Sequence, residues 1–335
     1  MPPKRTRSAR IYRDTPRNLA RLAAALRRGE LVAVPTETVY GLAANALDAV
    51  ACGKIFTAKG RPASDPLIVH IGHWRELAAV AVPNDAALRL AQEFWPGPLT
   101  IVLPKRPAVP GIVSAGLDSV AVRLPSHPLF RRLQRLAGIP LAAPSANPFG
   151  YVSPTTAQHV RDGLGKQIAH ILDGGPTTIG LESTIVDLRD PRHPRLLRPG
   201  AVTRAQLAQA LGCAVADGTK RKTVEHAAQL APGMLSRHYS PRTPVELHAP
   251  LAPVRARLSG PDEAWLFFAQ PRDVAGKNIF ALSEHGDLRA AAKRLFGILR
   301  QLDDAGYTRI HAELAPGGGL ADAINDRLRR AASRR

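Results

Sequence analysis

The chain has 335 residues, enough for two domains that each bury a core, since single domains commonly hold about 150 residues. Its two cysteines, Cys52 and Cys213, lie far apart, which excludes a disulfide scaffold and a cysteine-built zinc site and fits a reducing, cytoplasmic setting. No apolar run approaches the roughly 20 residues of a membrane span, and no apolar segment follows the basic N-terminus. We therefore expect neither a membrane helix nor export.

The charge balance is strongly basic. The sequence holds 46 Lys and Arg against 27 Asp and Glu, a formal net charge of +19. A field of that sign favours polyanionic ligands such as nucleotides, RNA or acidic lipid. Much of the charge gathers in residues 1–30 and 327–335, where it can equally serve as a solvated tail, so charge alone does not select the ligand.

Short runs rich in Val, Ile and Leu alternate with segments of helical apolar spacing, which predicts an α/β or α+β fold. The first helix is predicted over residues 16–28, because Leu19, Leu22 and Leu26 share a face and Gly29 can end it. Further helices are predicted over 48–58, 85–94, 128–136, 155–161 and 203–211. Strands are predicted over 31–34, 67–71, 99–103, 120–124, 140–143, 170–172 and 184–188. Most are continuous apolar runs, typical of strands buried on both faces.

The regular pattern stops between residues 213 and 243, which are rich in Gly, Pro and charged residues and read as a long linker. Beyond it, strands are predicted over 245–248, 265–269, 278–282 and 308–314, and helices over 287–302 and 320–332. We therefore predict a basic N-terminal tail over 1–16, a large domain over 17–212, a linker over 213–243 and a small α/β domain over 244–335.

Three polar clusters at the ends of predicted elements could carry chemistry. The segment Pro-Thr-Glu-Thr-Val-Tyr-Gly-Leu follows the first strand, where α/β folds bind ligands, although it could also be a turn with a helix cap. Lys59 and Arg61 flank Gly60 at a helix end, which suits a phosphate chain or merely stabilises that helix terminus. Pro-Ser-Ala-Asn-Pro, with Ser145 and Asn147, follows a buried strand and could hold a phosphate or form an ordinary turn.

Several familiar catalytic motifs are missing from the sequence. It has no G-x-x-x-x-G-K-[ST] phosphate loop, no G-x-S-x-G elbow and no H-E-x-x-H zinc motif. The sequence therefore argues against a serine hydrolase and against a zinc enzyme of these types.

The clusters are specific in combination. The segments Pro-Thr-Glu-Thr-Val-Tyr-Gly-Leu, Lys-Gly-Arg-Pro, Phe-Trp-Pro-Gly-Pro-Leu-Thr, Ser-Ala-Asn and Glu-Ser-Thr-Ile-Val-Asp closely resemble the YrdC family over residues 17–212. The later Pro-Gly-Met and His-Tyr-Ser-Pro resemble the linker of its longer, two-domain members. The resemblance implies a twisted sheet around a basic cavity, followed by a small Rossmann-like domain.

The function implied by this resemblance is the condensation of L-threonine, bicarbonate or carbon dioxide, and ATP into threonylcarbamoyl-adenylate and pyrophosphate. The product would pass to tRNA threonylcarbamoyl-transferase proteins for the threonylcarbamoyladenosine modification of tRNA. Magnesium would arrive with ATP and be held by no protein side chain. Direct contact of the basic cavity with tRNA or double-stranded RNA stays an open side role.

The resemblance also assigns residues by motif. It implies that Lys59 and Arg61 are catalytic and hold the triphosphate. The ATP-binding set is Lys59, Arg61, Asp65, Ser119, Ser145, Asn147, Ser153, Arg198 and Tyr239. The threonine-binding set is Thr38, His70, Arg123, Ala143 and Ser183.

Two positions depart from the family pattern. Asp65 replaces an expected Asn, and a carboxylate beside a triphosphate repels it unless a cation intervenes. Leu235 stands in the linker where a basic residue is usual.

One alternative belongs to another functional class. A double-stranded RNA or ribosome-binding protein would use the same basic concavity without catalysis, and the net charge supports it equally well. It does not explain Thr38, His70, Arg123 and Ser183 occurring together, and no aromatic-rich strand for base stacking is visible. A carbamoyltransferase of the hydrogenase-maturation type would need cysteine-rich zinc fingers, which two distant cysteines cannot form.

Overall fold

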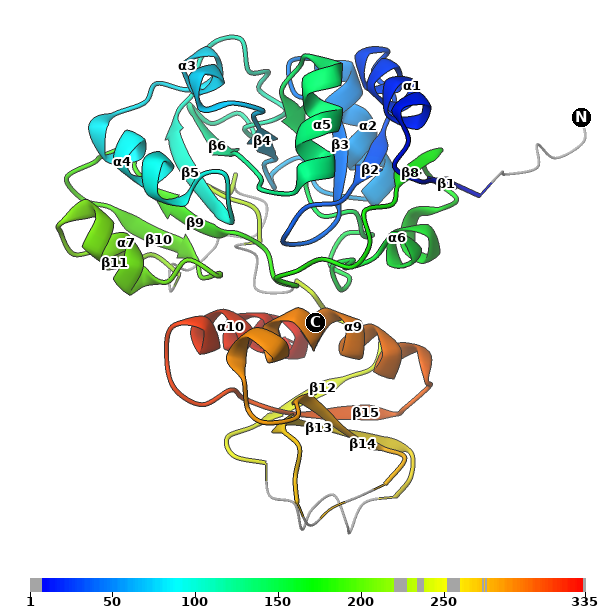
Figure 1. Ribbon diagram of the computed structural model, residues 1–335. Helices are drawn as coiled ribbons and strands as arrows, with labels where there is room; N and C mark the ends of the chain where they lie inside the picture. The colour runs from blue at the N-terminus through cyan, green and yellow to red at the C-terminus, as the bar shows by residue number, and fades with distance from the viewer. Residues whose placement is uncertain are drawn as a thin grey trace, which may run out of the picture.

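The computed structural model describes residues 8–219, 228–233, 238–251, 260–272, 274 and 276–333. A large N-terminal domain, drawn from blue to green in Figure 1, stands over a small C-terminal domain drawn from yellow to red. Leu235, where the sequence departs from the family pattern, lies outside the described residues. None of the described helices combines the length and apolar character that a membrane crossing requires.

The large domain is built on one mixed sheet of 11 strands, in the order β1-β8-β2-β3-β7-β4-β6-β5-β9-β10-β11. Its strands are β1 (Arg10–Tyr12), β2 (Val32–Val34), β3 (Gly41–Asn45), β4 (Ile68–His70), β5 (Leu99–Pro104), β6 (Ser119–Arg123), β7 (Leu141–Ala142), β8 (His170–Leu172), β9 (Thr184–Asp187), β10 (Arg195–Arg198) and β11 (Ala216–Asp217). Its helical elements are α1 (Pro16–Arg27), α2 (Ala49–Lys59), η1 (Trp74–Glu76), α3 (Leu77–Val80), α4 (Asp85–Phe94), α5 (Pro128–Ala137), α6 (Ala157–Leu164) and α7 (Arg204–Leu211).

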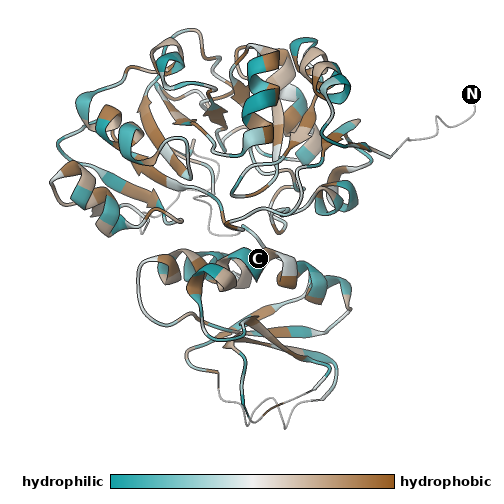
Figure 2. Cartoon of the chain, in the orientation of Figure 1, coloured by the Kyte–Doolittle hydropathy of each residue, from teal (hydrophilic) through white to brown (hydrophobic). Residues whose placement is uncertain are grey.

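Helices cover both faces of this sheet. On one face α1 and α5 pack with Val32 and Val34 of β2, whereas Ala33, with the opposite side-chain direction, packs with α2 on the other face. Strands such as β5 and β6 are brown in Figure 2, and the helices carry teal as well as brown residues, as amphipathic helices over a buried sheet should. The predicted mixed α/β class is confirmed.

The small domain has four parallel strands, β12 (Val245–His248), β13 (Glu263–Ala269), β14 (Ile279–Ser283) and β15 (Arg309–Glu313), in the order β12-β15-β13-β14. Helices α9 (Leu288–Asp304) and α10 (Leu320–Ala332) lie between this sheet and the large domain in Figure 1. A parallel sheet with crossover helices is the Rossmann-like arrangement that the resemblance implied.

The two domains share a core rather than touching at a polar seam. Val39, Val152 and Leu181 of the large domain belong to the same buried apolar cluster as the inner faces of α9 and α10. Gly180 has φ +82°, and a Cβ there would meet the backbone of Lys293 at 2.5 Å, so α9 approaches too closely for any larger residue. Arg327 of α10 is fully buried and donates to Glu182 at 2.9 Å across the interface.

Two predicted boundaries need correction. The basic tail over residues 1–16 is wrong for its second half, because Arg10–Tyr12 forms β1 and pairs with β8 at the sheet edge. The segment over 213–243 is not wholly irregular, because Ala216–Asp217 forms β11 and pairs with β10. Both strands are only two or three residues long and lack an apolar run that would reveal them.

Candidate active site

A polar pocket lies at the ends of strands β4 and β6 of the large sheet. His70 ends β4 and Arg123 ends β6, and these parallel strands pair so that the two residues lie side by side. Carboxyl ends of parallel strands converge, which is why α/β folds bind ligands there. Nine of the predicted site residues line the pocket: Thr38, Arg61, His70, Arg123, Ala143, Ser145, Ser183, Arg198 and Tyr239.

Arg123 is the centre of one end of the pocket. Its Nη1 donates to Thr38 Oγ1 at 2.9 Å, its Nε donates to the Gly97 carbonyl at 3.2 Å, and its Nη2 lies 2.8 Å from Glu37 Oε1. Two of the five guanidinium N–H donors are therefore used in hydrogen bonds, and Nη2 faces Glu37 as an ion pair. Arg123 thus already has an anionic partner, and an incoming carboxylate must share the guanidinium with Glu37.

The charges around Arg123 are fixed by burial and pairing. Burial opposes ionisation of Glu37, but Arg123 outweighs it and lowers the pKa of that carboxyl below its ordinary value. Burial, with Arg123 close by, lowers the pKa of His70 to about 3. His70 is therefore a neutral imidazole at pH 7, and Nδ1 lies 3.1 Å from the Ile68 carbonyl.

Hydroxyl groups line the neighbouring wall of the pocket. Ser183 Oγ lies 2.7 Å from Thr100 Oγ1 and accepts from Arg198 Nη2 at 3.0 Å. Arg198 Nε also donates to the Ser183 carbonyl at 3.0 Å. Arg198 is thereby held against the segment that leads into β9, beside the end of the pocket formed by Arg123.

The conformation of the Lys-Gly-Arg segment is set by the way helix α2 ends. Gly60 adopts φ 62° as the C-cap, so the chain reverses directly after Lys59 and brings Arg61 back toward the sheet. Lys59 Nζ donates to the Ser145 carbonyl at 2.5 Å and to the Asn147 carbonyl. Burial, together with Arg61, lowers the pKa of Lys59 well below its ordinary value. An anion in the pocket would therefore favour the charged form of Lys59.

Asp65 is the fully buried carboxylate behind these cations. Arg61 Nη2 lies 3.0 Å from Asp65 Oδ2 and donates to the Pro66 carbonyl at 2.7 Å. Burial raises the pKa of Asp65, and Arg61 opposes that rise. The cation that a carboxylate needs near a triphosphate is therefore present, and Asp65 stands behind Arg61 rather than on the pocket wall.

Three further predicted residues do not line the pocket. Asn147 donates to the carbonyls of Pro148 and Tyr151 at 2.9 Å, while its Oδ1 has no hydrogen-bond partner in the described part of the chain. Ser153 Oγ donates to Glu182 Oε1 at 2.5 Å. Ser119 begins β6 and so lies at the other end of that strand from Arg123.

The linker closes the pocket. Pro232, Gly233, His238 and Tyr239 are among the lining residues, and Ala231 packs in a buried apolar cluster with residues of strands β4, β5, β6, β9 and β10. Tyr239 is fully buried with φ 63°, a left-handed conformation that costs a non-glycine residue about 1–2 kcal/mol. Its ring lies under Arg327, 5.2 Å from the guanidinium carbon, so the small domain helps to hold it in place.

Glu37, Glu182 and His238 belong to the site but were not assigned roles from the sequence. Glu37 and Glu182 each lie one position from an assigned residue and each neutralises a buried arginine. Their positions next to assigned residues could have indicated their role, because buried arginines need carboxylates to balance their charge. His238 packs edge-on against Tyr239 with ring centroids 4.2 Å apart.

Cations, hydroxyls and a backbone-lined cleft at strand ends, with a linker folded over them, define a class: a protein that encloses a small anionic ligand. Family models narrow this class. Residues 24–200 match the Sua5/YciO/YrdC model, whose description is "Telomere recombination", and residues 202–333 match the model described as "Threonylcarbamoyl-AMP synthase, C-terminal domain".

Individual relatives agree with the family models. The chain is 42% identical over 318 residues to the threonylcarbamoyl-AMP synthase of Pyrococcus abyssi, covering 92% of each sequence. It is 39% identical to that of Bacillus subtilis, covering 95% of this chain and 93% of the relative. A solved structure of P. abyssi Sua5 complexed with L-threonine superposes with a TM-score of 0.87, at 39% identity and 96% coverage of both chains. The chain belongs to the threonylcarbamoyl-AMP synthase family in its two-domain form, which confirms the resemblance to the YrdC family.

Proposed function

We propose that this protein condenses L-threonine, bicarbonate or carbon dioxide, and ATP into threonylcarbamoyl-AMP and pyrophosphate, as a nucleotidyltransferase acting in the cytoplasm. The observation that carries the proposal is that one polar pocket is lined by Arg123, Thr38 and Ser183 and also by two further cations, Arg61 and Arg198. Membership of the synthase family supports the same activity. The RNA-binding alternative is not favoured, because it gives this convergence of small polar groups no role.

The threonine end of the pocket is proposed at Arg123. Arg123 suits the substrate carboxylate, while the hydroxyls of Thr38 and Ser183 can recognise the substrate hydroxyl by hydrogen bonds. Neutral His70 adds a polar group without adding charge, and Ala143 forms the wall opposite Gly41 with its Cβ 3.2 Å from where a Cβ on Gly41 would lie. Threonine's methyl group would then meet an apolar surface.

The ATP end is proposed around Lys59, Arg61 and Arg198, which would hold the phosphates. Ser145, Asn147, Ser119 and Ser153 would supply neutral hydrogen bonds to the nucleotide, and the unpartnered Asn147 Oδ1 supports this assignment. Asp65 would orient Arg61 through their 3.0 Å contact rather than touch a phosphate. Magnesium would arrive on the ATP phosphates, because the nearby carboxylates Asp65, Glu37 and Glu182 are each paired with an arginine.

The chemistry needs no protein nucleophile. The threonine amine attacks carbon dioxide and loses a proton, giving a carbamate. A carbamate oxygen then attacks the α-phosphorus in line, the bond to the bridging oxygen breaks, and pyrophosphate leaves with the electron pair. Both partners are anions, so the cations of the pocket act by alignment and charge neutralisation. The linker residues over the pocket would keep water from the carbamate and adenylate.

The partners beyond the small molecules are proposed from the family. The adenylate would be passed to tRNA threonylcarbamoyl-transferase proteins, which modify tRNA. The strongly basic ends of the chain suit a transient contact with tRNA or double-stranded RNA.

The decisive experiment measures pyrophosphate release from ATP and magnesium, with and without L-threonine and bicarbonate, and with serine in place of threonine. We expect release only when threonine and bicarbonate are both present, and slower release with serine, which lacks the methyl group that faces the apolar wall. Release that ignores threonine, or no release together with tight salt-sensitive RNA binding by the same sample, would overturn the proposal.

A smaller prediction concerns the lid residue Tyr239. Its buried hydroxyl has no hydrogen-bond partner among the described residues, and burying such a group costs about 1–3 kcal/mol. Tyr239→Phe should therefore raise the thermal unfolding temperature without nucleotide and raise the KM for ATP if the hydroxyl binds the nucleotide. Calorimetry with kinetics checks both parts. Tyr307→Phe, at a residue of the small domain distant in sequence from the pocket, is the matched control and should change neither.

A further inference from the structure

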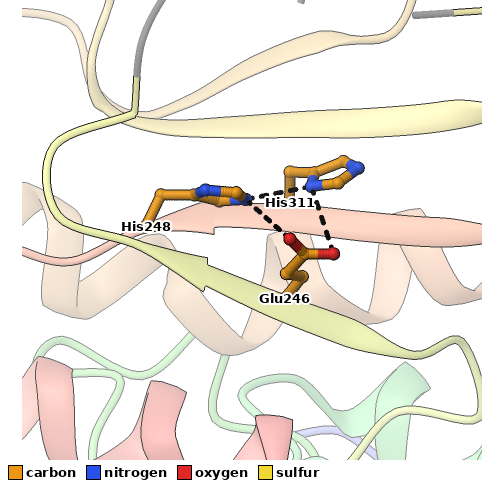
Figure 3. Close-up of side chains that lie close together, drawn as sticks. All are labelled: Glu246, His248 and His311. Atoms are coloured by element: carbon orange, nitrogen blue, oxygen red, sulfur yellow. Dashed lines mark hydrogen bonds and ion pairs between the residues drawn. The ribbon is translucent and has the colours of Figure 1, made fainter. Parts of the chain in front are cut away.

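Three metal-ligating side chains meet in the small domain, and none of them lines the pocket described above. Glu246 and His248 lie two positions apart on β12, and His311 lies on the neighbouring strand β15, paired in register with Glu246. Figure 3 shows their polar ends pointing toward one another from the two strands. In the described part of the chain, this is the one group of three such side chains close enough to share an ion.

The distances suit a shared ion. His248 Nε2 and His311 Nδ1 are 3.0 Å apart, and they lie 3.8 and 4.0 Å from Glu246 Oε1 and Oε2. Around a tetrahedral zinc ion with bonds of about 2.0–2.1 Å, neighbouring ligand atoms are about 3.3 Å apart. The three spacings bracket this value, so small rotations of the side chains would complete the coordination.

The surroundings of His311 are those of a metal ligand. Its second ring nitrogen, Nε2, lies 3.2 Å from Glu263 Oε2. When Nε2–H donates to that carboxylate, Nδ1 keeps its lone pair directed at His248 and Glu246. Trp265 stacks on the imidazole at 4.0 Å with an interplanar angle of 13°, which fixes the ring plane. Carboxylate partners of this kind accompany ligating histidines in metal sites.

Glu246 is also held in its orientation by a residue outside the cluster, Arg309. Arg309 Nη1 donates to Glu246 Oε2 at 2.7 Å, which leaves Oε1 on the side of His248. Arg309 also places a positive charge near the ion, which would lower the affinity for the metal but leave all three ligands in place.

The position on the sheet leaves access for an ion. Val245 and Leu247 point toward the core shared with α9 and α10, so Glu246 and His248, which alternate with them, lie on the opposite face. The Glu246 side chain is 42% exposed, whereas His248 and His311 are mostly buried. An ion can therefore reach ligands that are held by their burial.

We propose that Glu246, His248 and His311 form a binding site for one divalent transition-metal ion of the zinc type, with a fourth position open to water or an outside ligand. Two imidazole nitrogens select zinc, cobalt or nickel over magnesium and calcium, which prefer oxygen ligands. The site is thus chemically separate from the magnesium that accompanies ATP. A bound ion would cross-link β12, the strand that leaves the linker, to β15 in the interior of the sheet order.

The test uses the full-length, untagged protein, stripped with EDTA and desalted, in the absence of nucleotide. Cobalt(II) is titrated while visible absorption is recorded, followed by displacement with zinc. We expect one cobalt per chain. Glu246→Gln and His248→Gln should abolish saturable binding, and Glu263→Gln should weaken it by about 10–100-fold, because it orients His311 without binding the ion.

His285→Gln is the matched control, because His285 is an exposed histidine 4.0 Å from a glutamate but outside the cluster. It should bind cobalt like the unaltered protein. Zinc should also raise the thermal unfolding temperature of the unaltered protein and of His285→Gln, but not of His248→Gln. Glu246→Gln, at an exposed side chain, carries the test if His248→Gln does not fold. Binding that is substoichiometric, or that survives both Glu246→Gln and His248→Gln, would overturn the proposal.

Discussion

Lys59→Met is expected to reduce threonine-dependent pyrophosphate release by at least about 10²–10³-fold, the loss that follows removal of one preorganised group that stabilises developing charge. Lys59 is buried at the end of α2, and its ammonium reaches the loop that contains Ser145 and Asn147. Methionine keeps the unbranched shape and removes the charge. Steady-state pyrophosphate release, with circular dichroism to check folding, measures the effect.

Lys54→Met is the matched control, because Lys54 lies on the same helix and donates instead to the Gly29 carbonyl at 2.7 Å. It should retain nearly normal release. Near-normal turnover in Lys59→Met would remove Lys59 from the proposed ATP site, whereas equal losses in both variants would point to a general effect on α2.

The lowered pKa of Lys59 adds a signed pH prediction. Burial, with Arg61 nearby, disfavours the ammonium, and the ATP phosphates would favour it, so binding raises the pKa of Lys59. ATP binding should therefore take up a proton and weaken as the pH rises through the titration of Lys59. Calorimetry of an ATP analogue in buffers of different ionisation enthalpy detects this uptake, which should vanish in Lys59→Met.

Arg123→Lys is expected to raise the KM for threonine by about 10–100-fold while changing the KM for ATP by less than about 3-fold. A hydrogen bond to a charged group contributes about 1.5–3 kcal/mol, and lysine keeps the charge but loses the planar fork. Lysine is preferable to alanine here, because deleting the cation would leave Glu37 buried without its partner at a cost of about 3–5 kcal/mol.

Arg189→Lys is the control for this variant. Arg189 also pairs with a carboxylate at the sheet, reaching both oxygens of Asp187 at 2.9 Å, but it does not line the pocket. Its threonine KM should stay unchanged. Parallel increases in the KM for threonine and for ATP in Arg123→Lys would contradict a specific role at the carboxylate.

Much of the fold could be read from the sequence because most elements carry an apolar pattern. The long helices were predicted to within a few residues, as with α4 over residues 85–94 and α10 over 320–332. Strand β3 was missed because Gly41–Asn45 consists mainly of small residues with weak strand preference.

The site could be predicted one residue at a time but not as an arrangement. Motifs pointed to Thr38, Arg123 and Ser183, yet their local spacing contains no information about the partner of each. Glu37 pairs with Arg123, and Glu182 pairs with Arg327, which is 145 positions away. Such contacts depend on how the sheet and the small domain pack together, and a single sequence holds no direct record of that packing.

Arg327 couples the docking of the small domain to the affinity of the pocket for its ligand. It joins Glu182, which adjoins Ser183 in the pocket wall, and it lies over the ring of Tyr239. Breaking the contact between Arg327 and Glu182 while either side chain stays buried would cost about 3–5 kcal/mol. Coupling is reciprocal, so a ligand that stabilises the docked arrangement is itself bound more tightly by the same free energy. Weakening the contact of Arg327 with Glu182 should therefore weaken the binding of a ligand in the pocket, although Arg327 itself does not line it.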